Sequence, residues 1–367
     1  MCRLIGNKRN LIDFIETVVV DVRERLGGGK LRILDAFAGS SVVSRMLAAH
    51  SLELYSNDFE HYAHLFGKCF LEHPAPEVAA RVSMLVHQAN AYADVNTEAG
   101  IIANNYAPGD TNDIQQHERC FYTRENALRI DAVRRFIHEN CSAEEAPYLL
   151  APLLVQCSIR ANTTGVFNAF MKKDGVGCWG GRTEASGDRR RVMDALVLPE
   201  PVFNPHLGSL VKCFCRDANT LIPELPELDL IYVDSPYNQH SYGSNYGLLN
   251  IIAKNAMPER VTENSGIPCD WQRSAYYKKK EAAAAMSDLL NKATARASYV
   301  LISFSDEGHI DSDTWTKILK PYHSTVYQKD HRSTMGTRNY AKRGKSTVVE
   351  LLYLVWAKNK GLPPSGE

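Results

Sequence analysis

The chain has 367 residues, of which 44% are hydrophobic, and 42 Lys and Arg balance 42 Asp and Glu. This length is enough for one large domain or two ordinary ones, and the hydrophobic content excludes global disorder. The balanced charge does not decide whether nucleic acid is bound, because such a surface needs only a local positive patch.

The first elements in chain order predict a strand–turn–helix–strand unit. Apolar residues recur at helical spacing over 10–25, where a run of three glycines would end the helix. Strands are predicted over 31–35 and 52–56, with a tight turn and a helix over 42–49 between them. This arrangement is typical of the start of a doubly wound sheet.

The middle of the chain has a different character, with few strand signals. Thr123 is a predicted N-cap of a helix that runs to Ile137, and a second helix is expected over 147–161. Residues 162–191 are rich in Gly, Asn, Lys and Arg, which favours loop or irregular structure. We therefore predict an inserted, mainly helical subdomain over 76–199.

The sheet pattern resumes after this insertion. Strands are predicted over 210–214, 228–233 and 299–304, a helix over 279–297, and a long-looped hairpin from 324–327 and 348–356. The fold class is therefore predicted to be α/β, a doubly wound Rossmann-like sheet with an antiparallel C-terminal hairpin. Residues 1–75 and 200–360 would form this discontinuous domain.

Several negative signals narrow the class of protein. The nine Cys have no paired Cys-x-x-Cys spacing, and the twelve His show no metal-site pattern, so reduced thiols and no metal are expected. The first residues do not resemble a signal peptide, and no run of eighteen apolar residues occurs. We expect a cytoplasmic protein.

The strongest chemical signal is Asp234-Ser235-Pro236-Tyr237, directly after a mostly apolar strand. In an open parallel sheet, ligands bind beyond the carboxyl ends of strands. The amine of a nucleobase is a poor nucleophile, because its lone pair is delocalised into the ring. A carboxylate and a backbone carbonyl that accept its two protons would localise that lone pair, and an aromatic ring would stack on the base. The alternative is that this segment is only a turn at the end of a strand, in which the Asp-x-Pro sequence has no chemical role.

A second signal follows the first strand, at Asp35-Ala36-Phe37-Ala38-Gly39-Ser40. Glycine lets a ligand approach the backbone, and this turn leads into a helix N-terminus. Asp58 comes 19 residues after Gly39, close to the spacing at which an acid reaches a ribose hydroxyl in dinucleotide folds. The pair of signals favours a nucleoside site, although a turn with one glycine is weak alone.

These motifs and their order resemble the adenine-N6 DNA methyltransferases of the Dam-like group, the alpha or D12 class, over most of the chain. The resemblance implies methyl transfer from S-adenosylmethionine to a flipped adenine in double-stranded DNA, with a cognate restriction endonuclease as a further expected partner. It implies that Lys8 of the Gly6-Asn7-Lys8 element holds the cofactor carboxylate. The full implied cofactor set is Gly6, Asn7, Lys8, Asp35, Phe37, Gly39, Ser40, Asp58 and Asp217.

The resemblance also implies a catalytic tetrapeptide and a target-recognition domain in the insertion. Asp234, Ser235, Pro236 and Tyr237 would be catalytic. Residues 162–168 are similar to the group's Asn-x-x-Gly-x-Phe-Asn element. Basic residues outnumber acidic ones seven to four over 151–195 and eight to one over 317–345, which suits phosphate contacts. The expected DNA-binding residues are Asn162, Phe167, Asn168, Lys172, Lys173, Arg182, Arg332 and Arg338.

Two departures from the family pattern keep other functions open. Asn7 replaces a glycine, and Ser235 replaces a proline whose fixed φ would stiffen the loop. The alternatives are N4-cytosine methylation, methylation of RNA or of a protein amide, and a catalytically inactive DNA-binding module. Asp234 argues against the cytosine reaction, for which Ser would be expected at that position. Ser235 motivates the inactive module.

Overall fold

The computed structural model describes residues 8–180, 187–203, 210–237, 241–305, 308–331 and 348–360. The chain divides into two compact units. One, here called the sheet unit, contains the described residues of 8–59, 210–241 and 273–360. The other, here called the helical unit, contains those of 60–203 and 242–272.

A seven-stranded sheet forms the centre of the sheet unit, in the order β5-β2-β1-β6-β7-β9-β8. All neighbouring strands are parallel except the pairs β7–β9 and β8–β9. The predicted fold class and its C-terminal hairpin are therefore confirmed. The strands are β1 (Leu31–Asp35), β2 (Ser51–Asp58), β5 (Leu210–Cys215), β6 (Leu228–Val233), β7 (Ala297–Ser305), β8 (Tyr322–His331) and β9 (Val348–Ala357).

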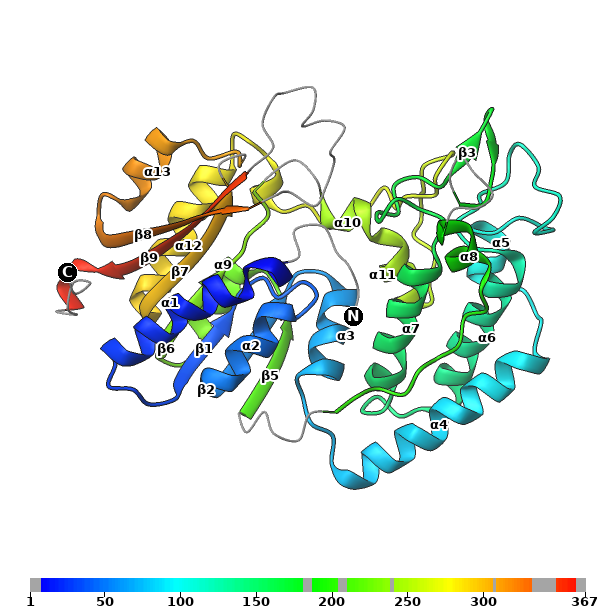
Figure 1. Ribbon diagram of the computed structural model, residues 1–367, viewed down its shortest axis with the longest axis horizontal. Coiled ribbons are helices and arrows are strands. Elements are labelled where there is room, and N and C mark those ends of the chain that lie inside the picture. Colours follow the sequence, from blue (N-terminus) through cyan, green and yellow to red (C-terminus); the bar gives the residue numbers. More distant parts are fainter. Residues whose placement is uncertain are drawn as a thin grey trace. The chain divides into compact units, whose positions relative to one another are not determined.

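Helices cover both faces of this sheet, as Figure 1 shows. Helices α1 (Ile12–Arg25) and α2 (Val42–His50) pack their apolar side chains on one face. Helices α9 (Ala218–Leu221), α12 (Ala282–Arg296) and α13 (Ser312–Leu319) pack on the other. Both faces are buried, which explains why β6 and β7 are nearly continuous apolar runs.

The strand order indicates where in the sheet the candidate site lies. The chain leaves β1 towards β2 on one side, whereas it leaves β6 towards β7 on the other, so these adjacent strands form the switch point of the sheet. Asp35 of β1 lies opposite Tyr232 of β6 in parallel register. The segments that follow these strands therefore emerge at the same edge.

The helical unit is built around one apolar core. Its elements are α3 (His61–Phe70), α4 (Pro76–Val95), α5 (Ile101–Asn105), α6 (Arg124–Asn140), α7 (Ala146–Arg160), α8 (Gly187–Met193), α10 (Tyr242–Asn245), α11 (Gly247–Lys254), and the short pair β3 (Lys172–Lys173) and β4 (Val176–Gly177). The side chain of Thr123 accepts a hydrogen bond from the Asn126 amide, so the predicted N-cap of α6 is confirmed.

The helical unit begins earlier than the predicted boundary at residue 76 and includes a second segment, 242–272. Its early start is explained by α3, which contacts α7 and α11. The amide of Tyr62 donates to Asn250 Oδ1 at 3.0 Å, and Asn250 Nδ2 donates to Glu60 Oε2 at 2.7 Å. Such contacts join residues almost 200 positions apart, which a local sequence pattern does not reveal.

Candidate active site

A buried ion-pair network lies at the carboxyl end of β6. The ammonium Nζ of Lys8 is 3.1 Å from Asp234 Oδ1 and 3.1 Å from Glu350 Oε1. The side chains of Lys8 and Glu350 are 4% and 3% exposed, whereas that of Asp234 is 17% exposed. One ammonium is therefore shared by two carboxylates, of which Asp234 is the more accessible.

The network shifts the protonation equilibria of its members. Burial raises the pKa of Asp234 to about 6, the Lys8 ammonium opposes that rise, and Glu350 adds to it. Burial alone would lower the pKa of Lys8, but its acidic neighbours, above all Asp234, raise that pKa well above its ordinary value. Lys8 therefore remains charged, while Asp234 is ionised at neutral pH and protonated in mild acid.

The rest of the tetrapeptide follows Asp234 without helix or strand structure. Ser235 is buried. The Tyr237 ring packs edge-on against Phe304 with 5.8 Å between centroids, and its carbonyl accepts a hydrogen bond from the His309 amide at 2.7 Å. Lys8 Nζ lies 5.2 Å from the Tyr237 ring centroid. The tetrapeptide is thus anchored on several sides although Pro is absent at position 235.

The turn after β1 holds the first carboxylates of the predicted cofactor set. Asp35 is buried, and its Oδ2 accepts a 2.6 Å hydrogen bond from Ser44 Oγ of α2. Gly39 has φ +52°, and its amide donates to Asp58 Oδ2 at 2.7 Å. Asp58 therefore holds the turn in place. Gly39 and Asp58, which are 19 positions apart in the sequence, are in direct contact.

Burial raises the pKa of Asp35 to about 7, with Ser44 opposing and Asp234 and Asp58 adding to the shift. Its folded pKa exceeds its unfolded value near 4, so the stability that the neutral carboxyl contributes is lost as pH rises through about 7. Asp35→Asn, which stays neutral, should therefore gain stability relative to the parent between pH 5 and pH 8. Chemical denaturation of both proteins measures this difference. An equal difference at the two pH values would contradict it.

Two aromatic rings lie beside this turn. Phe37 and Tyr276 meet edge-on with 5.4 Å between centroids, and Tyr276 donates a 2.7 Å hydrogen bond to Asn219 Oδ1. Asp217 Oδ1 accepts from the Thr220 amide at 3.1 Å as the N-cap of α9. Sequence reasoning missed Tyr276, because it lies in a short 3-10 turn without a motif.

Two of the predicted DNA-binding residues have internal roles instead. Phe167 is 3% exposed and packs with Phe121 and Tyr246 at centroid distances of 6.4 and 6.2 Å. Asn162 is fully buried, and its Nδ2 donates to the carbonyls of Cys120 and Cys178. Their assignment to DNA contact is corrected, because buried side chains that satisfy the core do not reach a ligand at the surface.

The remaining predicted DNA-binding residues fall into two groups. Asn168, Lys172 and Lys173 are exposed, and the two lysines form β3. The other predicted positions lie outside the described residues: Arg182, Arg332 and Arg338, together with Gly6 and Asn7 of the cofactor set.

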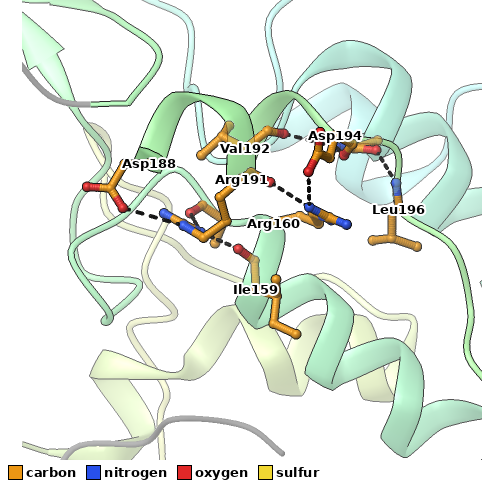
Figure 2. Close-up of polar contacts among 9 residues, drawn as sticks. Ile159, Arg160, Asp188, Arg191, Val192, Asp194 and Leu196 are labelled. Carbon is orange, nitrogen blue, oxygen red and sulfur yellow. Dashed lines mark hydrogen bonds and ion pairs between the residues drawn. The ribbon is translucent and has the colours of Figure 1, made fainter. Parts of the chain in front are cut away.

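Part of the basic character over 151–195 has a structural role, as Figure 2 shows. Arg160 Nη1 donates to the Arg191 carbonyl at 3.0 Å and contacts Asp194 Oδ2 at 3.1 Å. Arg191 donates to the carbonyls of Ile159 and Ala161. These two arginines fasten α8 to the end of α7, so they are not free for a polyanion.

The correction at Phe167 has a measurable consequence. Phe167→Ala should lower the free energy of unfolding by about 3–5 kcal/mol, because it leaves a cavity in the core. Lys173→Ala should change it by less than about 0.5 kcal/mol, since the side chain is exposed. Urea denaturation of both variants measures these values, and a loss below about 1 kcal/mol for Phe167→Ala would contradict the buried placement.

Two kinds of structural feature are absent from the described residues. No group of three or more His, Cys, Asp or Glu side chains there is arranged to hold a metal ion. None of the helices described combines the length and apolar character needed to cross a membrane.

Comparison with known proteins gives several relatives. The chain is 28% identical to the Type II methyltransferase M.FokI of Planomicrobium okeanokoites, over 95% of this chain and 51% of that protein. It is 29% identical to the modification methylase StsI of Streptococcus sanguinis, over 98% and 53%. It is also 28% identical to the Type II methyltransferase M.NlaIII of Neisseria lactamica, over 83% of each. The chain therefore spans about half the length of the first two relatives.

A family model also matches the chain. The model describes the D12 class of N6 adenine-specific DNA methyltransferases, and its match runs over residues 4–303. That range includes the turn after β1, the helical unit and the tetrapeptide after β6. The chain belongs to the D12 class N6 adenine-specific DNA methyltransferase family.

Proposed function

We propose that this protein transfers the methyl group of S-adenosylmethionine to the N6 amine of adenine in double-stranded DNA. The observation that carries the proposal is the partly exposed Asp234 carboxylate at the switch point of the sheet, next to Tyr237. An acceptor of this kind, followed by a backbone carbonyl and an aromatic ring, suits a planar amine. Membership of the D12 class supports the same reaction and base.

The residues around the turn after β1 fit a sulfonium cofactor in two respects. Asp58 and Asp234 place carboxylates near one edge of the sheet, which favours a cation, while Asp35 beside them is about half ionised at neutral pH because its pKa is about 7. A Cβ built on Gly39 would meet no atom within 4 Å, so the backbone there is open to a close approach. Asp58 would contact the ribose, and Phe37 and Asp217 the adenine ring. Ser40 would line the same turn.

Lys8 would contact the cofactor carboxylate. An ammonium has three N–H donors, and two of those of Lys8 face Asp234 and Glu350. In the proposed complex the third would donate to the cofactor carboxylate. When bound, S-adenosylmethionine supplies an electrophilic methyl group on a positively charged sulfur.

The chain's own contribution to the chemistry would be positioning and electrostatics. The Asp234 carboxylate and the Ser235 carbonyl would accept hydrogen bonds from the two N6–H groups, which localises the nitrogen lone pair and stabilises the positive charge that develops on it. The methylated nitrogen then loses one of these protons. Tyr237 would stack on the flipped base, with Pro236 restricting the loop. Flipping costs a few kcal/mol, which stacking and phosphate contacts must offset.

The helical unit is proposed to recognise the DNA target. Support comes from the exposed lysines of β3 and from Asn168 on the preceding loop. A cognate restriction endonuclease is proposed as a partner in the cell, because the relatives are named Type II methyltransferases and modification methylases.

Expression in a bacterial host without its own adenine methylation tests the proposed function. Mass spectrometry of nucleosides from the host DNA should detect N6-methyladenine, and single-molecule sequencing should place it in one sequence motif. N4-methylcytosine would overturn the choice of base. Methylation confined to RNA or protein would overturn the choice of substrate, and no methylation at all would favour an inactive binding module.

A further inference from the structure

Glu350 is a buried carboxylate for which the proposed reaction has no direct use. It lies on β9, and its Oε1 accepts a 2.6 Å hydrogen bond from Ser303 Oγ of β7. The same oxygen is 3.1 Å from Lys8 Nζ. In the antiparallel register Glu350 pairs with Ser305, so its side chain reaches diagonally along β7 to Ser303. Burying a charge in this way is costly unless it has a specific partner.

The partner of Glu350 is also the partner of Asp234. Lys8 Nζ is equally distant from the two carboxylates, and only Asp234 has an appreciable exposed fraction. Without Glu350, the whole ammonium charge would act on Asp234, whose oxygens would then be held by Lys8 rather than offered to an amine. With Glu350 present, the three groups carry one net negative charge, and Asp234 is the member able to meet a substrate.

We infer that Glu350 is a positioning residue that holds the Lys8 ammonium and so keeps the Asp234 carboxylate available as the acceptor for the target amine. The inference rests on the proposed function. Glu350 is linked to Asp234 through Lys8, because both carboxylates pair with that ammonium. It acts through Lys8, and the hydrogen bond from Ser303 fixes the orientation of the Glu350 carboxylate.

The charges around Asp234 determine how this role affects pH dependence. Lys8 faces Asp234 from the turn before α1, Glu350 from β9 and Asp35 from β1, while the Tyr232 hydroxyl belongs to β6. Glu350 raises the pKa of Asp234 and Lys8 lowers it. Methyl transfer needs ionised Asp234, so activity should fall as pH drops through about 6. Removing the charge of Glu350 removes a cause of the rise, so this acid limb should move to lower pH.

The test is the pH profile of kcat/KM and kcat for the full chain and for Glu350→Gln, with unmethylated plasmid DNA and labelled cofactor. We expect the plateau of kcat to fall about 10- to 100-fold, as for a misplaced catalytic group, while the acid midpoint moves to lower pH. A merely structural role would reduce the active fraction equally at every pH and leave the midpoint unchanged. That result would overturn the inference.

Two further variants keep the test decisive if Glu350→Gln folds poorly. Glu350→Asp retains the charge and should keep the parent's acid midpoint. In a Lys8→Met background, Glu350→Gln should cause no further loss of kcat, because its route to Asp234 is gone; an additive loss would contradict the inference. If the parent methylates no DNA at any pH, the proposed function fails and the inference fails with it. If the parent is active and Glu350→Gln matches it, the inference alone fails.

Discussion

Asp234→Asn should reduce kcat for methyl transfer by a factor on the order of 10³ or more while the protein stays folded. Asparagine has nearly the shape of aspartate but lacks its charge, and its NH₂ cannot accept an amine proton. Loss of one preorganised electrostatic contact typically costs 10²–10³ in kcat. Here the lost charge is also a hydrogen-bond acceptor for the target amine, which favours the upper end of that range.

The fold should tolerate this substitution because Lys8 keeps a second carboxylate, Glu350, at 3.1 Å. Single-turnover methylation of DNA measures the rate, and thermal unfolding checks the fold. Asp313→Asn is the matched control, since Asp313 is an exposed carboxylate in the first turn of α13. The control should keep the parent rate. Asp234→Asn within about tenfold of the parent would rule out Asp234 as the amine acceptor.

Lys8→Met should destabilise the protein and lower kcat to a residual rate that single-turnover assays still measure. Removing one partner from a buried ion pair typically costs about 3–5 kcal/mol, because the remaining charge is left without compensation. Here Asp234 and Glu350 would be left together in a buried site. Adding Glu350→Gln to this variant should recover part of the lost stability but none of the activity.

The pH dependence of this stability loss has a definite sign. The Lys8 ammonium lowers the pKa of Asp234, so in Lys8→Met that pKa should rise further above its unfolded value. The stability that neutral Asp234 contributes is complete below the unfolded pKa and is lost as pH rises through the folded one. Lys8→Met should therefore lose more stability at pH 8 than at pH 5. Urea denaturation at both values measures the loss, and a smaller loss at pH 8 would refute the buried pairing.

The sheet could be predicted from the sequence because its signals are local. The apolar runs at 228–233 and 299–304 were sufficient to place β6 and β7, and Thr123 marked the start of α6 by its capping chemistry. The boundary of the helical unit could not be predicted in this way. It depends on α3 and α11, which meet only after the chain has folded, through contacts such as that of Tyr62 with Asn250.

The site residues that lie at the end of a strand could be predicted from the sequence. The residues that reach the site from other parts of the fold could not. Asp234 and Asp35 follow the rule for strand ends. Glu350 gave a weaker signal. It is a single acidic residue in an otherwise apolar strand, which indicates a buried partner but does not identify that partner. The prediction that Phe167 and Asn162 contact DNA was wrong for a different reason. A family pattern records that a residue type recurs but does not separate packing in the core from contact with DNA.

The most direct test of the central claim is incubation of purified protein with unmethylated plasmid DNA and S-adenosylmethionine carrying an isotopically heavy methyl group. Enzymatic digestion and mass spectrometry then identify the labelled nucleoside, with Asp234→Asn measured in parallel. We predict heavy N6-methyladenine from the parent and none above background from the variant. A labelled base other than N6-methyladenine, or equal labelling by both proteins, would contradict the account.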